Sequence, residues 1–302
     1  MTNPYYNNAY DQDDGETIDV ADFAPEFSAI GAGFDQIHAK IQSVISGIPA
    51  MVAASLASAN EFDNGLFRYW QRGSSFSSPA SGQYLADRWF WSTSTDDAVT
   101  ITQETHPAGD NGVPFGARRF MRIAVTAGTT GTVNRFTQYI ENVNLAAGKA
   151  RKITVYAKPS VAMTITVVGA QIFGSGGSAA AVFSCGSLVF DEVGVMQRRE
   201  CTFNIPSTDG KTHVDNEHYT QYQFRIPVNQ TYTLDVGGLY MAPPEIEVAY
   251  MHEHPAITLK RCQRFFRRGT VQRPTFDLLL DGMRVAPTET LASGIYSYDS
   301  EF

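Results

Sequence analysis

The sequence predicts a mainly β protein, an antiparallel sandwich of two sheets that follows one amphipathic helix. Over residues 92–250, short β-prone runs alternate with Gly, Pro, Asn and Asp turn signals, and no long helical pattern interrupts them. Before residue 50, apolar side chains recur at alternating spacings of four and three. Many short strands without intervening helices favour an antiparallel sandwich over an α/β enzyme fold.

The composition agrees with one main β domain plus appendages. The chain has 302 residues, of which 43% are hydrophobic, 12% aromatic and only 18% charged, with a formal charge of −8. This negative charge argues against a general nucleic-acid binder. Neither an apolar run long enough to span a membrane nor a signal peptide is visible, so we expect synthesis in the cytoplasm without membrane insertion.

Residues 1–22 form an acidic segment without apolar periodicity. They include Asp11, Asp13, Asp14, Glu16 and Asp19 beside Asn, Tyr and Gly. Such a composition predicts an extended segment that becomes ordered on a partner, and the alternative is a disordered tail.

The segment of residues 23–59 begins with a heptad seam, which predicts a helix from about residue 24 to residue 46. Asp22 can cap this helix, and Pro49 follows it. The seam could pack on the β domain of its own chain. We favour a parallel trimeric coiled coil, because Ile and Phe occupy both seam positions. The seam residues are Phe23, Phe27, Ile30, Phe34, Ile37, Ile41, Val44 and Ile48.

The β domain is predicted to span residues 60–256. Its opening stretch, Asn60–Trp91, contains every tryptophan of the chain, so we expect the first strands and much of the core there. The later strands are predicted at residues 98–102, 120–126, 133–140, 152–157, 163–171, 182–190, 198–205, 219–225 and 232–239.

Four motifs in this order resemble one family of virion proteins. They are NGLFRYWQRGSSF with YLADRW at residues 64–89, QYIENVNLAAGKARKITVYAK at 138–158, CQRFF at 262–266 and MRVAPT at 283–288. Together they resemble bacteriophage tail-fibre and related virion proteins with a carbohydrate-binding-module-like jelly roll.

The resemblance implies a jelly-roll sandwich in a short homotrimeric fibre. Residues 1–22 would attach to other phage virion proteins, residues 257–302 would add strands to the sandwich or to a neighbouring subunit, and the head would contact host cell-surface polysaccharide. The expected location is the virion, as a tail fibre or a capsid-attached fibre. Two alternatives are an adaptor with a purely structural role and a spike that degrades polysaccharide.

No catalytic constellation is evident. The sequence has no GxSxG, HExxH, Walker or Rossmann motif, so we expect a protein that is not an enzyme and has no cofactor. Paired carboxylates for glycoside hydrolysis remain available by residue type. They are Asp87, Glu104, Asp191, Glu192 and Glu200. Cys185, Cys201 and Cys262 lack a CxxC spacing and are expected to be reduced thiols.

Histidines and a cluster of basic residues are two further features that could have a function. His252 and His254 would project from one face of a strand, as two ligands of a metal ion would, but a pair at the surface or at an interface is favoured. His213 and His218 are expected to be solvated. A basic cluster is expected to form a strand edge that faces solvent or another subunit, where it could meet the acidic N-terminal segment of a second chain. Its members are Lys260, Arg261, Arg264, Arg267, Arg268 and Arg273.

Sugar binding needs aromatic rings that stack on pyranose faces and polar groups that bind hydroxyls. Tyr219, Tyr222 and Tyr240 are the main candidates by residue type, and Tyr232 and Tyr250 are further candidates. The loops at residues 174–178 and 208–217 are further candidates for the rim of a ligand site.

Overall fold

The structure is a computed structural model that describes residues 25, 28–41, 60–107, 117–247, 254–273, 278 and 283–301. The chain divides into two units, residues 1–53 and residues 54–302. Within the described residues, no helix is both long enough and apolar enough to cross a membrane.

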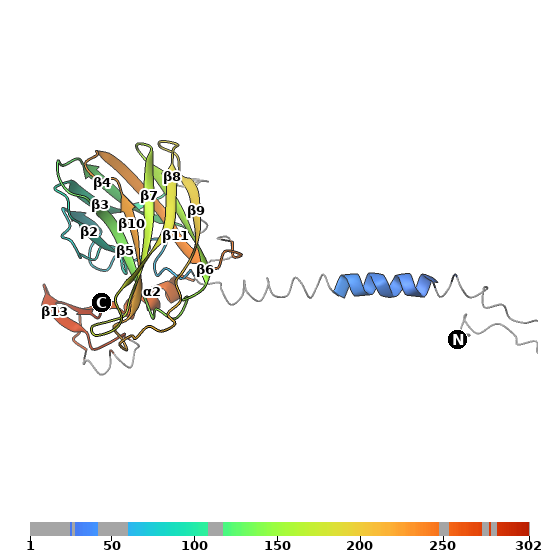
Figure 1. Ribbon diagram of the computed structural model, residues 1–302. Coiled ribbons are helices and arrows are strands. Elements are labelled where there is room, and N and C mark those ends of the chain that lie inside the picture. The colour runs from blue at the N-terminus through green and yellow to red at the C-terminus, as the bar shows by residue number, and fades with distance from the viewer. Residues whose placement is uncertain are drawn as a thin grey trace, which may run out of the picture. The chain divides into compact units, whose positions relative to one another are not determined.

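The sandwich of the second unit consists of two antiparallel sheets (Figure 1). The six-stranded sheet has the order β1 (Ser75–Ser77), β3 (Ala98–Thr105), β4 (Arg119–Thr126), β11 (Tyr232–Ala242), β6 (Ala150–Pro159) and β9 (Gln197–Asn204). The five-stranded sheet has the order β2 (Phe90–Thr93), β5 (Asn134–Glu141), β10 (Tyr219–Ile226), β7 (Met163–Ile172) and β8 (Ala181–Phe190). All nine strands predicted between residues 98 and 239 are confirmed.

The strand pairing is nested. β4 pairs with β11, β5 with β10, β6 with β9 and β7 with β8, all of them antiparallel. A long hairpin folded over itself in this way places alternate pairs in opposite sheets, which is the jelly-roll form of the sandwich.

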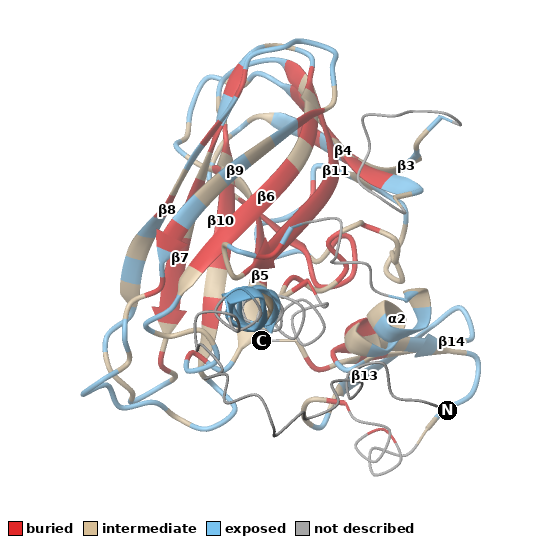
Figure 2. Ribbon diagram, turned by 90° about the vertical axis from the view of Figure 1, so that its right-hand side faces the viewer, coloured by how far each residue is buried: buried red, intermediate tan, exposed pale blue. Residues whose placement is uncertain are grey.

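Aromatic side chains from both the strands and the opening stretch fill the space between the sheets. Phe136 of β5 and Phe224 of β10 are cross-strand partners whose rings stack 5.0 Å apart, and Trp89 packs against both. Trp89 and Trp91 are fully buried. Buried residues follow β6, β7, β10 and β11 in Figure 2, as expected for strands that turn one face to a shared core.

The opening stretch supplies core residues as predicted, but most of it is not strand. Only the short β1 and β2 form there. Asn64, Phe67 and Arg88 have positive φ values of 51°, 49° and 73°, which a strand does not allow. The Asn64 side chain stabilises these bends, because its amide donates to the Tyr69 carbonyl and its oxygen accepts from the Arg68 amide.

The C-terminal segment begins with a helix, so the prediction of strands alone was wrong. Helix α2 spans Pro255–Gln263, and β12 (Phe266–Gly269), β14 (Ile295–Asp299) and β13 (Thr288–Ala292) form a three-stranded sheet in that order. His254 caps the helix by accepting a hydrogen bond from the Ala256 amide, and Pro255 occupies the first turn. Local capping therefore overrides the apolar run that suggested a strand.

The first unit is described only by part of its predicted helix. Residues 28–41 are helical, and Ile30, Phe34, Ile37 and Ile41 are 49–68% exposed on that helix. The other seam residues, Phe23, Phe27, Val44 and Ile48, lie outside the described residues, as do the acidic segment 1–22 and the end of the predicted helix. The trimeric interface stays a prediction.

Candidate functional site

A row of aromatic rings lies on the outer face of the five-stranded sheet. Phe136 and Phe224 point inward. Tyr139 on β5 and Tyr219 on β10 lie an odd number of residues away from them, so these two side chains point outward. The Tyr139 and Tyr219 ring centroids are 4.4 Å apart, and the Phe90 ring of β2 lies 4.6 Å from Tyr139. We call these three residues the aromatic row.

The two tyrosines of the aromatic row are half-buried, whereas Phe90 is only 5% exposed and also packs against the Tyr84 ring. Burial raises the pKa of both phenols, and the Tyr219 charge raises that of Tyr139 further. The phenols therefore stay protonated at neutral pH and can donate as well as accept hydrogen bonds.

Polar side chains stand beside the aromatic row on the same face. The Gln223 carbonyl oxygen accepts hydrogen bonds from Arg135 Nη1 (2.7 Å) and Arg225 Nη2 (2.9 Å). Arg135 Nη2 also donates to the Ser92 hydroxyl at 3.3 Å. Burial, together with the neighbouring Arg225, lowers the pKa of Arg135. Rings and fixed donors thus share one sheet surface.

The predicted ligand tyrosines are not gathered in one place. Tyr219 belongs to the aromatic row, whereas Tyr222, Tyr232 and Tyr240 are only 2–3% exposed within the sandwich. Tyr250 lies outside the described residues. Sequence reasoning missed Tyr139 and Phe90, although the alternation of β5 around Phe136 could have placed Tyr139 on the outer face.

A cavity of about 330 Å³ opens at the end of the sandwich where β5 and β11 end and β6 and β10 begin. Its floor contains Tyr222 and Met241, which are buried, and the mostly exposed Leu145 lies at its side. Arg151 Nε and Glu61 Oε1 are 2.7 Å apart in its wall, as an ion pair without hydrogen-bond alignment. Burial raises the pKa of Glu61, and Arg151 opposes that rise. We call this space the end cavity.

Two further cavities adjoin the end cavity. One of about 190 Å³ shares Glu61, Leu145 and Arg261 with it, and another of about 450 Å³ shares Leu145 and Asn142. The latter is also lined by Glu141, whose cross-strand partner is Tyr219. The hollowed end of the sandwich therefore adjoins the aromatic row.

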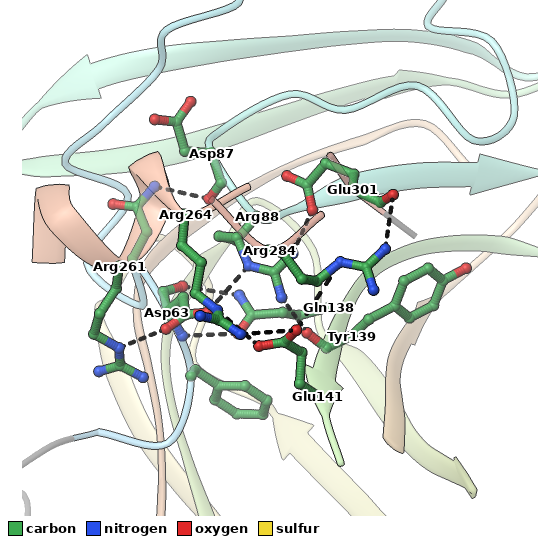
Figure 3. Close-up of polar contacts among 12 residues, drawn as sticks. Asp63, Asp87, Arg88, Gln138, Tyr139, Glu141, Arg261, Arg264, Arg284 and Glu301 are labelled. Atoms are coloured by element: carbon green, nitrogen blue, oxygen red, sulfur yellow. Dashed lines mark hydrogen bonds and ion pairs between the residues drawn. The ribbon is translucent and has the colours of Figure 1, made fainter. Parts of the chain in front are cut away.

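A buried ion-pair network around Arg88, which also lines the cavity of about 190 Å³, is drawn in Figure 3. Arg88 is 1% exposed; its Nε lies 3.0 Å from Asp63 Oδ2, its Nη1 contacts Glu301, and its Nη2 donates to the Tyr139 carbonyl at 2.5 Å. The guanidinium carbon lies 3.3 Å from the centre of the Phe265 ring. Burial raises the pKa of Glu301 although Arg88 lowers it.

Arginines of the predicted basic cluster bind groups of the same unit. Arg261 Nε lies 2.6 Å from Asp63, Arg264 Nε lies 2.9 Å from Glu141, and Arg268 Nη1 donates to the Gln71 carbonyl. The cluster begins on α2 rather than on a strand edge. Its proposed contact with an acidic segment of another chain stays a prediction.

The histidines differ from the sequence interpretation. His254 caps α2 through Nδ1 instead of facing a metal from a strand, and His252 lies outside the described residues. His213 is exposed, as expected, and His218 is half-buried, with their rings 4.5 Å apart. Together with Asp215, each offers a possible ligand atom within 4.8 Å of the others. His218 Nδ1, however, already accepts a hydrogen bond from the Val143 amide, which weakens a metal assignment.

Four of the five carboxylates considered for hydrolysis have separate structural partners, and the fifth, Glu192, is exposed. Asp87 is 1% exposed and binds Gln71, while Glu104 accepts from Thr102, Glu200 from Thr154 and Asp191 from Arg199. All three cysteines are free; Cys185 and Cys262 are buried and Cys201 is partly buried.

No protein-family model matches the chain, and no curated protein matches it. Solved structures with a similar arrangement include the enzymatically active domain of bacteriophage CBA120 tailspike protein 4, with 15% identity, a TM-score of 0.39, and coverage of 60% of this chain and 21% of that one. A family 11 carbohydrate-binding module of Clostridium thermocellum has 16% identity, a TM-score of 0.35, and coverage of 60% and 98%. A xylan-binding domain of Paenibacillus barcinonensis has 12% identity, a TM-score of 0.35, and coverage of 56% and 98%. The chain thus spans about a fifth of the tailspike domain.

Proposed function

We propose that this protein is a phage fibre subunit whose β-sandwich binds polysaccharide on the host surface through the aromatic row. The proposal depends on one observation: the half-buried rings of Tyr139 and Tyr219 lie 4.4 Å apart on one sheet face, with the buried Phe90 packed on Tyr139. Arg135, Gln223 and Arg225 lie on the same face. The protein acts as a binding module and not as an enzyme, and it works on the virion.

The chemistry of the aromatic row suits an extended sugar chain. Pyranose rings present C–H groups on their faces, which pack on aromatic rings, and hydroxyls at their edges, which need donors and acceptors. The half-buried Tyr139 and Tyr219 rings, 4.4 Å apart, offer apolar surface, and the buried Phe90 ring packs 4.6 Å from Tyr139. The amide and guanidinium groups lie beside these rings. We infer that this face accommodates internal units of a polymer.

A trimer would strengthen such binding. The four seam residues at positions 30, 34, 37 and 41 are exposed on their helix, and a strict heptad seam with Ile and Phe favours three strands. Three linked heads that each bind weakly gain avidity because the second and third contacts become intramolecular. We therefore include the homotrimer, and attachment to other virion proteins through residues 1–22, in the proposal.

The test is binding of the full chain to a microarray of bacterial surface polysaccharides. Tyr139→Ala and Tyr219→Ala should each weaken binding about 5-fold or more, since stacking on one aromatic ring contributes on the order of 1 kcal/mol or more. Tyr156→Ala is the matched control, because Tyr156 is a half-buried tyrosine on the other sheet.

Other outcomes would favour the other roles. A trimer that binds no polysaccharide would indicate an adaptor or a capsid-attached fibre with an assembly role alone. Release of reducing sugar ends from a bound polysaccharide, lost on replacement of one carboxylate, would indicate a degrading spike instead.

A further inference from the structure

The end cavity is a second place where a ligand could bind. Small-molecule sites typically occupy about 300–1,000 Å³ and combine apolar walls with a few convergent polar groups. At about 330 Å³ the end cavity lies at the small end of this range, which suits one or two rings rather than a polymer. It shares Asn142 and Leu145 with the cavity that is also lined by Glu141, the cross-strand partner of Tyr219.

The walls supply both surfaces that a sugar ring requires. Ile140, Leu145 and Met241 present apolar surface. Leu145 is 61% exposed, which is unusual for a leucine beside a cavity, and ligand burial would remove that surface from water. Asn142 and Thr220 add an amide and a hydroxyl.

The ion pair of Glu61 and Arg151 is suited to a vicinal diol. A carboxylate only accepts hydrogen bonds and a guanidinium only donates them, whereas each sugar hydroxyl does both. Two adjacent hydroxyls can therefore donate to Glu61 while they accept from Arg151. A carboxylate has two oxygens that together offer about four acceptor positions, so Glu61 keeps acceptor capacity for such a ligand beside its 2.7 Å contact with Arg151.

We propose that the end cavity binds the terminal residue of a glycan, with vicinal hydroxyls on Glu61 and Arg151 and the ring face on Leu145. This inference rests on the proposed function, and it adds recognition of a chain end to recognition of internal units by the aromatic row. A fibre with both sites would distinguish a polysaccharide by its terminal sugar.

The test uses the full chain and a panel of methyl glycosides of hexoses, 2-acetamidohexoses and hexuronic acids, measured by ligand-observed NMR. At least one glycoside should bind. Glu61→Gln should weaken its binding at least tenfold, because the charged acceptor is lost without a change of shape. Leu145→Ala should weaken it severalfold with no effect on folding, since this side chain is mostly exposed. Leu291→Ala, at a leucine that is 59% exposed on β13, is the control.

The two sites are separated by Tyr219→Ala, which should reduce polysaccharide binding and leave glycoside binding unchanged. Polysaccharide binding that depends on Tyr219, without any glycoside bound, would overturn the end-cavity proposal and leave the aromatic row intact. Glycoside binding that is unchanged by Glu61→Gln and by Leu145→Ala would also overturn the end-cavity proposal. If neither polymer nor glycoside binds, both proposals fail.

Discussion

Replacement of Arg88 by methionine tests the view that the buried network holds the C-terminal segment on the sandwich. Arg88 lies against two carboxylates, Asp63 and Glu301, whose side chains are only 13% and 4% exposed. Methionine keeps much of the apolar volume over the Phe265 ring but leaves both carboxylates without this partner.

Removal of one partner from a buried ion pair costs about 3–5 kcal/mol, which is a large part of a total stability of about 5–15 kcal/mol. For a domain of this size, each kcal/mol lowers Tm by roughly 2–4 °C, so Arg88→Met should lower Tm by about 6–20 °C. Thermal and urea unfolding followed by circular dichroism measure the change. Arg199→Met is the control, because the pair of Arg199 and Asp191 is 32% and 67% exposed and should contribute less than about 1 kcal/mol.

The destabilisation caused by Arg88→Met should also depend on pH. Burial raises the folded-state pKa of Glu301 above 4.5, with Arg88 and Arg72 opposing and Asp299 adding to the rise. A carboxyl whose folded pKa is raised binds more protons in the folded state, so stability falls as pH rises through that window. Loss of Arg88 raises this pKa further, and the difference in unfolding free energy between variant and wild type should be larger at pH 7 than at pH 4. The reasoning would be refuted if Arg88→Met destabilised the protein equally at both pH values. It would also be refuted if Arg199→Met destabilised the protein as much as Arg88→Met does.

Three further changes have expected outcomes. Gly65→Ala should cost about 2 kcal/mol or more in urea unfolding, because a Cβ there would collide with the Leu239 carbonyl. Ile37→Asp should convert a trimer to monomers in sedimentation analysis, whereas Gln36→Asp, outside the seam, should not. An unchanged assembly state in both variants would contradict the predicted coiled coil. Asp235→Asn should destabilise the sandwich by about 3 kcal/mol, since this carboxylate is 3% exposed between Arg122 and Lys158, and a loss below 1 kcal/mol would contradict that role.

The motifs that carry the family resemblance have a structural explanation. Gln71 binds both Asp87 and the Phe266 carbonyl, and Arg72 lies 3.0 Å from Asp299 and 3.6 Å from the centre of the Phe266 ring. The WQRG and ADRW motifs therefore hold the CQRFF segment against the start of the domain. Motif residues that looked informative about function thus contribute mainly to the assembly of the head.

The sequence by itself determined the nine strands predicted between residues 98 and 239, and it predicted a helix over residues 24–46, of which 28–41 are described as helical. Local alternation of apolar and polar residues encodes which face of an element is buried. It could not determine α2, since a short apolar run fits a helix or a strand and the His254 cap decided between them.

Only the tertiary structure decided the candidate sites. Tyr139 and Tyr219 come from strands far apart in the chain and meet because β5 and β10 pair with Glu141 opposite Tyr219. The end cavity likewise combines Glu61 of the opening stretch with Arg151 of β6. A sequence pattern specifies the period of each element, whereas convergence of side chains depends on register and sheet order, which arise when distant strands pair.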